Sequence, residues 1–226
     1  MTNSQFKKTV TLAITGASGA QYALRLLECL LASHCRVYLM ISRAAEVVIR
    51  TETDLVLPEN LDDQQALLGK VYGAKEKQLT LYSREDWFAP VASGSSSPAS
   101  MVVCPASGGT LSSIASGASN NLIERAADVA LKERRQLIVV PRETPYSQVH
   151  LENMLKITQM GAVVLPASPG LYQKPKTIDD LIDFIVARIL DQLNIEQHVF
   201  PRWGEADISE NSSKNSIEVK GTKNEC

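Results

Sequence analysis

The stretch "VTLAITGASGAQYALRLLECLL", residues 10–31, decides the fold because it passes from a strand pattern to a helix pattern through one short turn. Val10–Thr15 is largely apolar and rich in β-branched residues, which favours a strand covered on both faces. Gly16 and Gly19 let the backbone turn tightly after it. The apolar residues that follow recur at helical spacing and form one stripe: Ala20, Ala23, Leu24, Leu27 and Leu31. This order predicts a strand–turn–helix unit of a parallel α/β sheet.

The same alternation continues along the chain. Further strands are expected at Arg36–Ile41, Gln78–Tyr82, Met101–Cys104, Leu137–Val140 and Ala162–Pro166. Helices are expected at Ala20–Leu31, Asn121–Arg135 and Leu151–Met160, and a long one opens at Thr177; Leu57–Asp63 reads as a surface connection. The pattern predicts an α/β fold: a Rossmann-like (flavodoxin-like) parallel sheet with helices on both faces, in a single domain. Ligands of such sheets bind at the carboxyl ends of the strands.

Composition excludes several classes of protein. The net charge of −2 gives no reason to expect a nucleic acid or an anionic membrane as partner. No apolar run approaches the roughly 18 residues of a membrane span, and the polar start lacks the apolar core of a signal peptide. The four cysteines form no CxxC pair, which favours reduced thiols and a cytoplasmic location. Residues 1–205 are expected to form the domain, and residues 206–226 a disordered polar tail.

Residues 87–123 contain no charged side chain and are rich in glycine and serine. A flexible linker is one interpretation, but the segment contains the expected strand Met101–Cys104. A surface covered by a ligand or by another subunit is the better interpretation.

Two small-residue turns each follow an expected strand. "TGASGA", residues 15–20, matches neither GxGxxG nor the P-loop, yet it would present helix N–H groups to an anion. The second strand ends at Ser42, where a dinucleotide site would offer an acidic residue, so one phosphate, as in FMN, fits better. "PASGGT", residues 105–110, is a second turn of this kind. Plain strand–helix turns remain the alternative.

Charged residues frame a possible anion site. Arg125 and Lys132 lie two helical turns apart on one face, although a solvated face is the commoner explanation for such a pair. Arg142 follows a buried strand between two prolines, and arginine matches phosphate bidentately. Glu143 beside it would not help to bind an anion, which suggests proton transfer. Arg188 lies among apolar residues of the long helix, where a snorkelling side chain is the simpler interpretation.

The segment "DDLID", residues 179–183, matches the pattern by which prenyl synthases bind magnesium and a diphosphate. It also lies in the first turns after Thr177, where acids favour the helix dipole. Thr177 and Asp180 resemble a capping box, so capping is the favoured interpretation and no metal site is expected.

Long blocks of the chain together resemble the UbiX family of flavin prenyltransferases: "TGASGAQY", "TETD", "DWFAPVASGS", "NNLIERAADVALKERR", "PRETP", "HLENM" and "PRWGE". The resemblance covers residues 10–205. It implies a Rossmann-like homododecamer with active sites at subunit junctions. It also implies metal-independent transfer of a dimethylallyl group from dimethylallyl monophosphate to N5 and C6 of reduced FMN. The product, prenylated FMN, would serve a UbiD-type decarboxylase, as in ubiquinone biosynthesis.

The resemblance also implies roles for individual residues. The implied FMN contacts are Gly16, Ala17, Ser18, Ser42, Ser107, Gly108, Gly109, Thr110 and Arg142. The groups implied around the prenyl donor are Trp87, Gly94, Arg125, Lys132, Tyr172 and Arg188. Ser18 and Glu52 would relay the proton of flavin N5, whereas Lys132 and Glu143 would act on the departing phosphate. Because monophosphate is a poor leaving group, cations and a proton donor beside it make chemical sense.

Two other functions remain open. An FMN-dependent decarboxylase of the cysteine-decarboxylase type would share a flavoprotein fold but uses a histidine near the first helix. The nearest candidate, His34, follows the far end of that helix. A non-catalytic FMN carrier or chaperone is the other possibility, and it would leave the mass of FMN unchanged.

Overall fold

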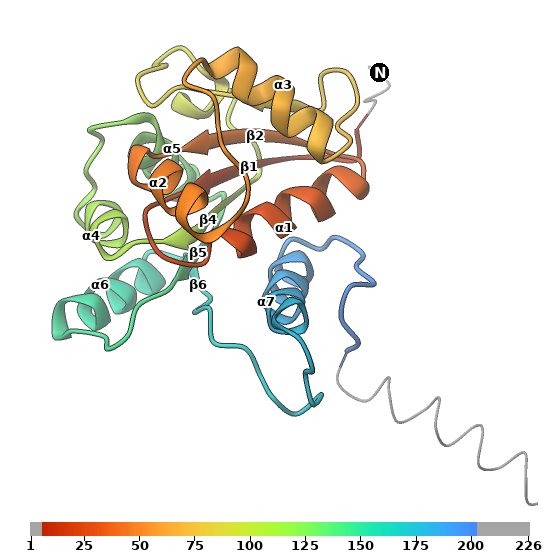
Figure 1. The fold of residues 1–226 in the computed structure, drawn as a ribbon. Helices are drawn as coiled ribbons and strands as arrows, with labels where there is room; N and C mark the ends of the chain where they lie inside the picture. Colours follow the sequence, from red (N-terminus) through yellow and green to blue (C-terminus); the bar gives the residue numbers. More distant parts are fainter. Residues whose placement is uncertain (1–5, 203–226) are drawn as a thin grey trace, which may run out of the picture.

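The computed structural model describes residues 6–202 and forms one parallel sheet with helices on both faces (Figure 1). The strands are β1 (Lys8–Ile14), β2 (Cys35–Ile41), β3 (Leu79–Leu81), β4 (Ser100–Ala106), β5 (Gln136–Pro141) and β6 (Val163–Val164). Their spatial order is β3-β2-β1-β4-β5-β6, and every neighbouring pair is parallel. The predicted fold class is therefore confirmed. The expected tail, residues 206–226, lies outside the described residues.

Seven α-helices occur in the described part of the chain. They are α1 (Ala20–Ala32), α2 (Arg43–Glu52), α3 (Leu61–Val71), α4 (Gly108–Ser116), α5 (Leu122–Lys132), α6 (Gln148–Gln159) and α7 (Ile178–Gln192). None of the helices described in residues 6–202 is long and apolar enough to cross a membrane.

Alternate residues of the central strands enter two separate hydrophobic cores, as the period of a strand requires. On β4, Val102 and Cys104 pack into the core that includes the buried face of α7, whereas Met101 and Val103 pack into the core that includes α4 and α5. The helix α1 lies beside α7 on the first face. Consequently α5 and α7 cover opposite faces of the sheet.

Some expected boundaries differ from the structure. Leu57–Asp63 is not entirely a surface connection, because α3 begins at Leu61 with Asn60 as its N-cap. The side chain of Asn60 accepts hydrogen bonds from the backbone of Asp62 and Asp63. This helix was missed because few of its side chains are buried and the apolar stripe is short. The helix α6 also starts before Leu151, since Ser147 caps it, and β6 is shorter than Ala162–Pro166.

The strand order reverses between β1 and β4, which are neighbours although two strands separate them in sequence. From β1 the chain proceeds outward to β2 and β3, and from β4 it proceeds the other way. Open α/β sheets bind ligands in the crevice at such a switch point. Both glycine-containing turns predicted from the sequence lie here.

Candidate functional site

The turns after β1 and β4 are joined by hydrogen bonds through Thr15. Its Oγ1 donates to the carbonyl of Pro105 at 2.8 Å and accepts from the backbone N–H of Ser107 at 2.9 Å. Thr15 is buried, so these bonds are shielded from water. The two turns therefore lie side by side and form one platform at the switch point.

The first turn is shaped by its two glycines. An added Cβ at Gly16 would lie well inside van der Waals contact with the Cβ of Ala44 in α2, so a larger side chain has no room there. Gly19 has a φ of 104°, a conformation that L side chains rarely adopt. The glycines thus bring α2 close to the turn and set the direction in which α1 leaves it.

Glu52, the last residue of α2, reaches the start of α1. Its Oε2 accepts hydrogen bonds from the backbone N–H groups of Gly19 at 2.8 Å and Ala20 at 3.0 Å. The expectation that these helix N–H groups are free for an anion is wrong, because the chain's own carboxylate occupies them. A ligand phosphate therefore needs other donors.

The electrostatic surroundings of Glu52 hold it in the ionised form. Burial raises its pKa, but hydrogen bonds from Ser18, Gly19 and Ala20 and the charge of Arg142 outweigh burial, so the net shift is downward. Arg142 is fixed beside the turn because its Nε donates to the carbonyl of Ser18 at 3.0 Å. Ser18, Glu52 and Arg142, predicted from separate parts of the sequence, are thus brought together.

Further donors surround this platform. Ser42 caps α2 and Ser107 caps α4, each accepting from a backbone N–H of the helix that it starts. Gly108 and Gly109 are the first two residues of α4, whose N–H groups have no partner inside the helix. An added Cβ at Gly109 would meet nothing within 4 Å, so the space beside it is open. Thr110 also bonds to Ser107 through its hydroxyl, at 3.1 Å.

Sequence reasoning missed a histidine at the same turn. The Nε2 of His150 lies 2.5 Å from where a Cβ would stand on Gly108, and its Nδ1 accepts from the N–H of Ser147 in the capping box of α6. His34, the histidine considered for a decarboxylase, follows α1 and precedes β2, at the amino edge of the sheet. It is therefore remote from the platform.

The two charged residues that follow β5, Arg142 and Glu143, point to different surroundings. Arg142 turns toward the first turn, as described, whereas Glu143 is exposed and accepts from the N–H of Thr144 at 3.0 Å. Tyr146, which the sequence analysis did not consider, lies in the same segment. Burial and the charge of Glu143 raise the pKa of Tyr146, and the opposing effect of the Arg142 charge is smaller.

One group of predicted substrate residues gathers along α5. Arg125 donates through Nε to the carbonyl of Ala92 at 3.1 Å and pairs with Asp128. Gly94 lies so close to Glu133 that a Cβ would overlap its carboxylate. Lys132 is bound to the same Glu133 at 2.6 Å. Gly94, Arg125 and Lys132 therefore belong to one surface, formed by α5 and the loop before β4.

Trp87 precedes this loop, and in the single chain it is 47% exposed while the adjacent Phe88 is fully exposed. The charge-free segment that begins here also supplies β4, all of whose residues are buried. Part of the missing charge is thus explained by the core. The exposed aromatic pair is the large apolar part of this segment that a ligand or a second subunit could cover.

Tyr172 and Arg188 line a different pocket, with a volume of about 750 Å³, at the side of α7. Asp191 accepts from Arg188 at 3.2 Å and from Arg202 at 3.3 Å, and Phe184 packs edge-on against Tyr172. Asp191 and Arg202 were missed by the sequence analysis, although the i,i+3 spacing of Arg188 and Asp191 was a usable signal. Because α5 and α7 cover opposite faces of the sheet, one chain does not unite the two groups of predicted substrate residues.

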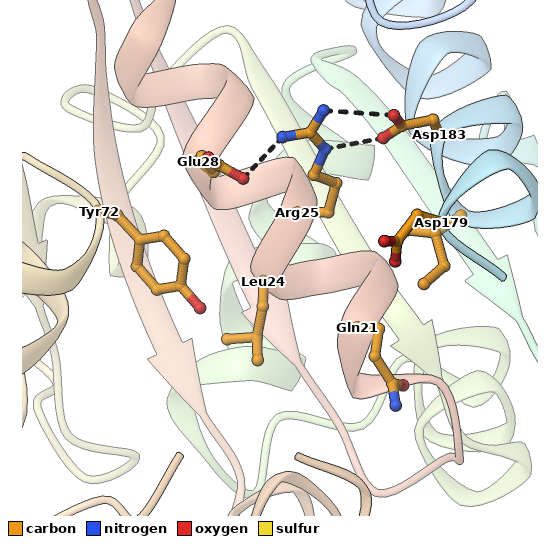
Figure 2. Close-up of a pocket in the computed structure, with 8 residues that line it drawn as sticks. Gln21, Leu24, Arg25, Glu28, Tyr72, Asp179 and Asp183 are labelled. Carbon is orange, nitrogen blue, oxygen red and sulfur yellow. Dashed lines mark hydrogen bonds and ion pairs between the residues drawn. The ribbon is translucent and has the colours of Figure 1, made fainter. Parts of the chain in front are cut away.

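The acidic segment 179–183 has structural roles. Thr177 and Asp180 form the predicted capping box, so that interpretation is confirmed. Asp183 accepts two hydrogen bonds from Arg25, at 2.7 and 3.2 Å, and Glu28 accepts a third at 2.7 Å. Figure 2 shows these pairs in a pocket of about 450 Å³ between α1 and α7. Within residues 6–202 there is no group of three or more His, Cys, Asp or Glu side chains that could hold a metal ion.

Comparison with known proteins places this geometry in a family. The Flavoprotein family model matches residues 1–190. The flavin prenyltransferase UbiX of Pseudomonas aeruginosa is 58% identical over 88% of this chain and 95% of its own.

Two solved structures are similar throughout. AnUbiX (PadA1), in complex with FMN and dimethylallyl pyrophosphate, is 40% identical, with a TM-score of 0.78 over 87% of this chain and 97% of its own. A dodecameric FMN-dependent UbiX-like decarboxylase from Escherichia coli O157:H7 is 36% identical, with a TM-score of 0.75 over 86% of this chain and 98% of its own. The chain therefore belongs to the Flavoprotein family and, within it, to the UbiX flavin prenyltransferases.

Proposed function

We propose that this protein transfers a dimethylallyl group from dimethylallyl monophosphate to N5 and C6 of reduced FMN and delivers the product to a UbiD-type decarboxylase. The observation that carries the proposal is the cluster of Ser18, Glu52 and Arg142 at the switch point. It combines a proton acceptor, a hydroxyl and a fixed cation where ligands of such sheets bind. Relatives named flavin prenyltransferases support the same reaction.

The residues at the switch point fit FMN. The unpaired N–H groups of Gly108 and Gly109 and the hydroxyls of Ser42 and Ser107 are suited to a phosphate monoester at a helix N-terminus. Open space beside Gly109 lets a ligand approach the backbone. Reduced FMN, when bound, would supply the nucleophilic N5 and C6 for the reaction.

Ser18 and Glu52 are suited to remove the proton that N5 must lose. Hydrogen bonds keep Glu52 ionised, so its carboxylate is ready to take a proton that Ser18 Oγ passes on. The guanidinium of Arg142 fixes the turn that carries Ser18. This relay needs no movement of the backbone, because Ser18 already bonds to both partners, through its side chain to the Glu52 carboxylate and through its carbonyl to the Arg142 guanidinium.

The phosphate that leaves the prenyl donor needs positive charge and a proton. Arg125 and Lys132 on one surface, with Tyr172 and Arg188 on another, are suited to bind it once both surfaces face one site. Glu143 is exposed after β5 and is our candidate for the acid that protonates the departing phosphate. Trp87 would cover the apolar prenyl group.

Because these two surfaces lie on opposite faces of the sheet, we propose that subunits of a homo-oligomer, a dodecamer, unite them. The helix α6 supports an assembly, since Val149, Leu151 and Leu155 are each more than half exposed in the single chain. Apolar patches of this kind mark protein interfaces.

The test is the mass of the flavin released after anaerobic incubation of the protein with reduced FMN, dimethylallyl monophosphate and EDTA. A flavin heavier by one dimethylallyl unit would establish prenyl transfer and show that no chelatable metal is required. A parallel incubation with dimethylallyl diphosphate would show which leaving group is used. Unchanged FMN would refute the proposal and favour an FMN carrier or a cysteine-type decarboxylase. Release of carbon dioxide from a peptidyl cysteine would then identify the decarboxylase, and its absence would favour the carrier.

A further inference from the structure

The end of α2 and the start of α1 are held together by hydrogen bonds that run in both directions. The carboxylate of Glu52 accepts from the backbone of Gly19 and Ala20. In return, the side-chain Nε2 of Gln21, the second residue of α1, donates to the backbone carbonyl of Glu52 at 2.9 Å. Each segment thus uses a side chain to satisfy the backbone of the other.

The carbonyl of Glu52 needs such a donor. Glu52 is the last residue of α2, and the last carbonyls of a helix have no partner within it. Thr53 is already extended, with φ of −138° and ψ of 166°, so the chain leaves the helix directly after Glu52. The end of α2 is also held by Thr53, whose N–H donates to the carbonyl of Ile49 at 3.0 Å, so the bond from Gln21 is the contact that fixes the Glu52 carbonyl itself and thereby the backbone that carries the carboxylate.

We infer that Gln21 is a positioning residue, which holds the backbone of Glu52 so that its carboxylate stays against Ser18 and the start of α1. The inference rests on the proposed function only in giving Glu52 a role in proton transfer. Gln21 itself is not a catalytic residue, because its amide bonds to the backbone and not to the carboxylate.

Loss of this bond should alter the titration of Glu52. In the intact protein the donors around the carboxylate lower its pKa against the opposing effect of burial, and Arg142 is the charged group that adds to them. A carboxylate that moves away from these donors loses hydrogen bonds that stabilise its ionised form, while burial continues to destabilise that form. Its pKa therefore rises, and the acid limb of the rate profile moves to higher pH.

Gln21 can be replaced without disturbing a packed core. Figure 2 shows Gln21 on the wall of the pocket between α1 and α7, together with Leu24 and Arg25, so a new side chain meets a pocket and not a packed core. Methionine has the same length as glutamine and a similar helix propensity but no donor. Gln21→Met therefore removes the hydrogen bond and leaves the helix intact.

The control is Gln136→Met. Gln136 makes the same kind of bond, from its Nε2 to the carbonyl of Gln192 at 2.6 Å, and its Oε1 also accepts from Ser100 Oγ at 3.0 Å. It begins β5, at the amino ends of the strands, whereas Glu52 lies at their carboxyl ends. Both variants are purified as full-length assemblies. The rate of prenyl transfer is measured against pH, the KM for dimethylallyl monophosphate is determined, and the Glu52 carboxylate is titrated by infrared difference spectroscopy against Glu52→Gln.

One net hydrogen bond corresponds to a rate loss of about fivefold. We expect that loss in the kcat of Gln21→Met, with little change in KM and with the acid limb and the Glu52 titration both moved to higher pH. Gln136→Met should lose thermal stability, while the pH of its acid limb and the pKa of Glu52 stay as in the wild type. An unchanged profile in Gln21→Met, or an equal shift in the control, would overturn the inference. If the wild type transfers no prenyl group, the proposed function fails, and the infrared titration alone decides whether Gln21 positions Glu52.

Discussion

Replacing Glu52 by glutamine should reduce both activity and stability, and the loss of stability should depend on pH. The carboxylate accepts from Gly19 at 2.8 Å and from Ala20 at 3.0 Å, and Ser18 also bonds to it. A hydrogen bond to a charged group is worth about 1.5–3 kcal/mol. The glutamine keeps one acceptor oxygen, and solvent screens this partly exposed site, so we expect a net loss of about 1–2 kcal/mol at neutral pH.

The sign of the pH dependence follows from the lowered pKa of Glu52 in the folded protein. A carboxylate with a depressed pKa contributes stability that is fully present above its unfolded pKa and is lost as pH falls through the folded value. Glutamine does not titrate. The difference in unfolding free energy between wild type and Glu52→Gln should therefore be largest at neutral pH and should shrink toward zero in acid.

Urea unfolding at a series of pH values, with both proteins at the same protomer concentration, measures this difference. Glu59→Gln is the control, because Glu59 is exposed on the connection before α3 and should change stability little at any pH. The kcat of Glu52→Gln should fall by about 10²–10⁴-fold, the usual contribution of a positioned acid or base. A stability loss that is equal at all pH values would refute the electrostatic argument, and an unchanged kcat would refute the proton relay.

Three other changes test separate parts of the structure. Gly16→Ala should destabilise the protein by about 1–3 kcal/mol through overlap with Ala44, and Ala44→Gly in the same chain should restore thermal stability and FMN binding. Asp183→Asn removes the charge that binds Arg25 between α7 and α1 and should lower the unfolding free energy by about 1 kcal/mol, less at high salt; no change would show that solvent replaces the pair. Glu143→Gln should slow prenyl transfer by at least tenfold and leave the Kd for FMN unchanged, and an equal effect on both would remove its catalytic role.

Local patterns predicted those parts of the fold that depend on neighbouring residues. The strand β4 was recognised because the run Met101–Cys104 within it is apolar throughout, as expected for a strand covered on both faces. Thr177 was recognisable as a cap because a cap bonds to a backbone group within three residues. The helix α3 escaped detection because only Gln64 and Leu68 of its residues are buried, too few to form a periodic signal.

Contacts between distant segments were beyond the reach of spacing arguments. Glu52 meets Gly19 across 33 positions, and Arg142 meets Ser18 across 124. Family resemblance proposed these residues as site members, but it did not reveal that Glu52 caps α1. That contact changes the interpretation of the first turn, because the helix N-terminus stabilises an internal carboxylate, and we propose the start of α4 for a ligand phosphate.

The arrangement of the site suggests how its two tasks are divided. The groups proposed to handle the N5 proton are joined by hydrogen bonds within one chain, because Ser18 bonds to both Glu52 and Arg142. The groups proposed to bind the departing phosphate are divided between α5 and α7 on opposite faces of the sheet. Flavin positioning is therefore expected to survive in a single subunit, whereas ionisation of the prenyl donor requires assembly. A variant that dissociates the oligomer through the exposed face of α6 should accordingly lose prenyl transfer before it loses the low pKa of Glu52.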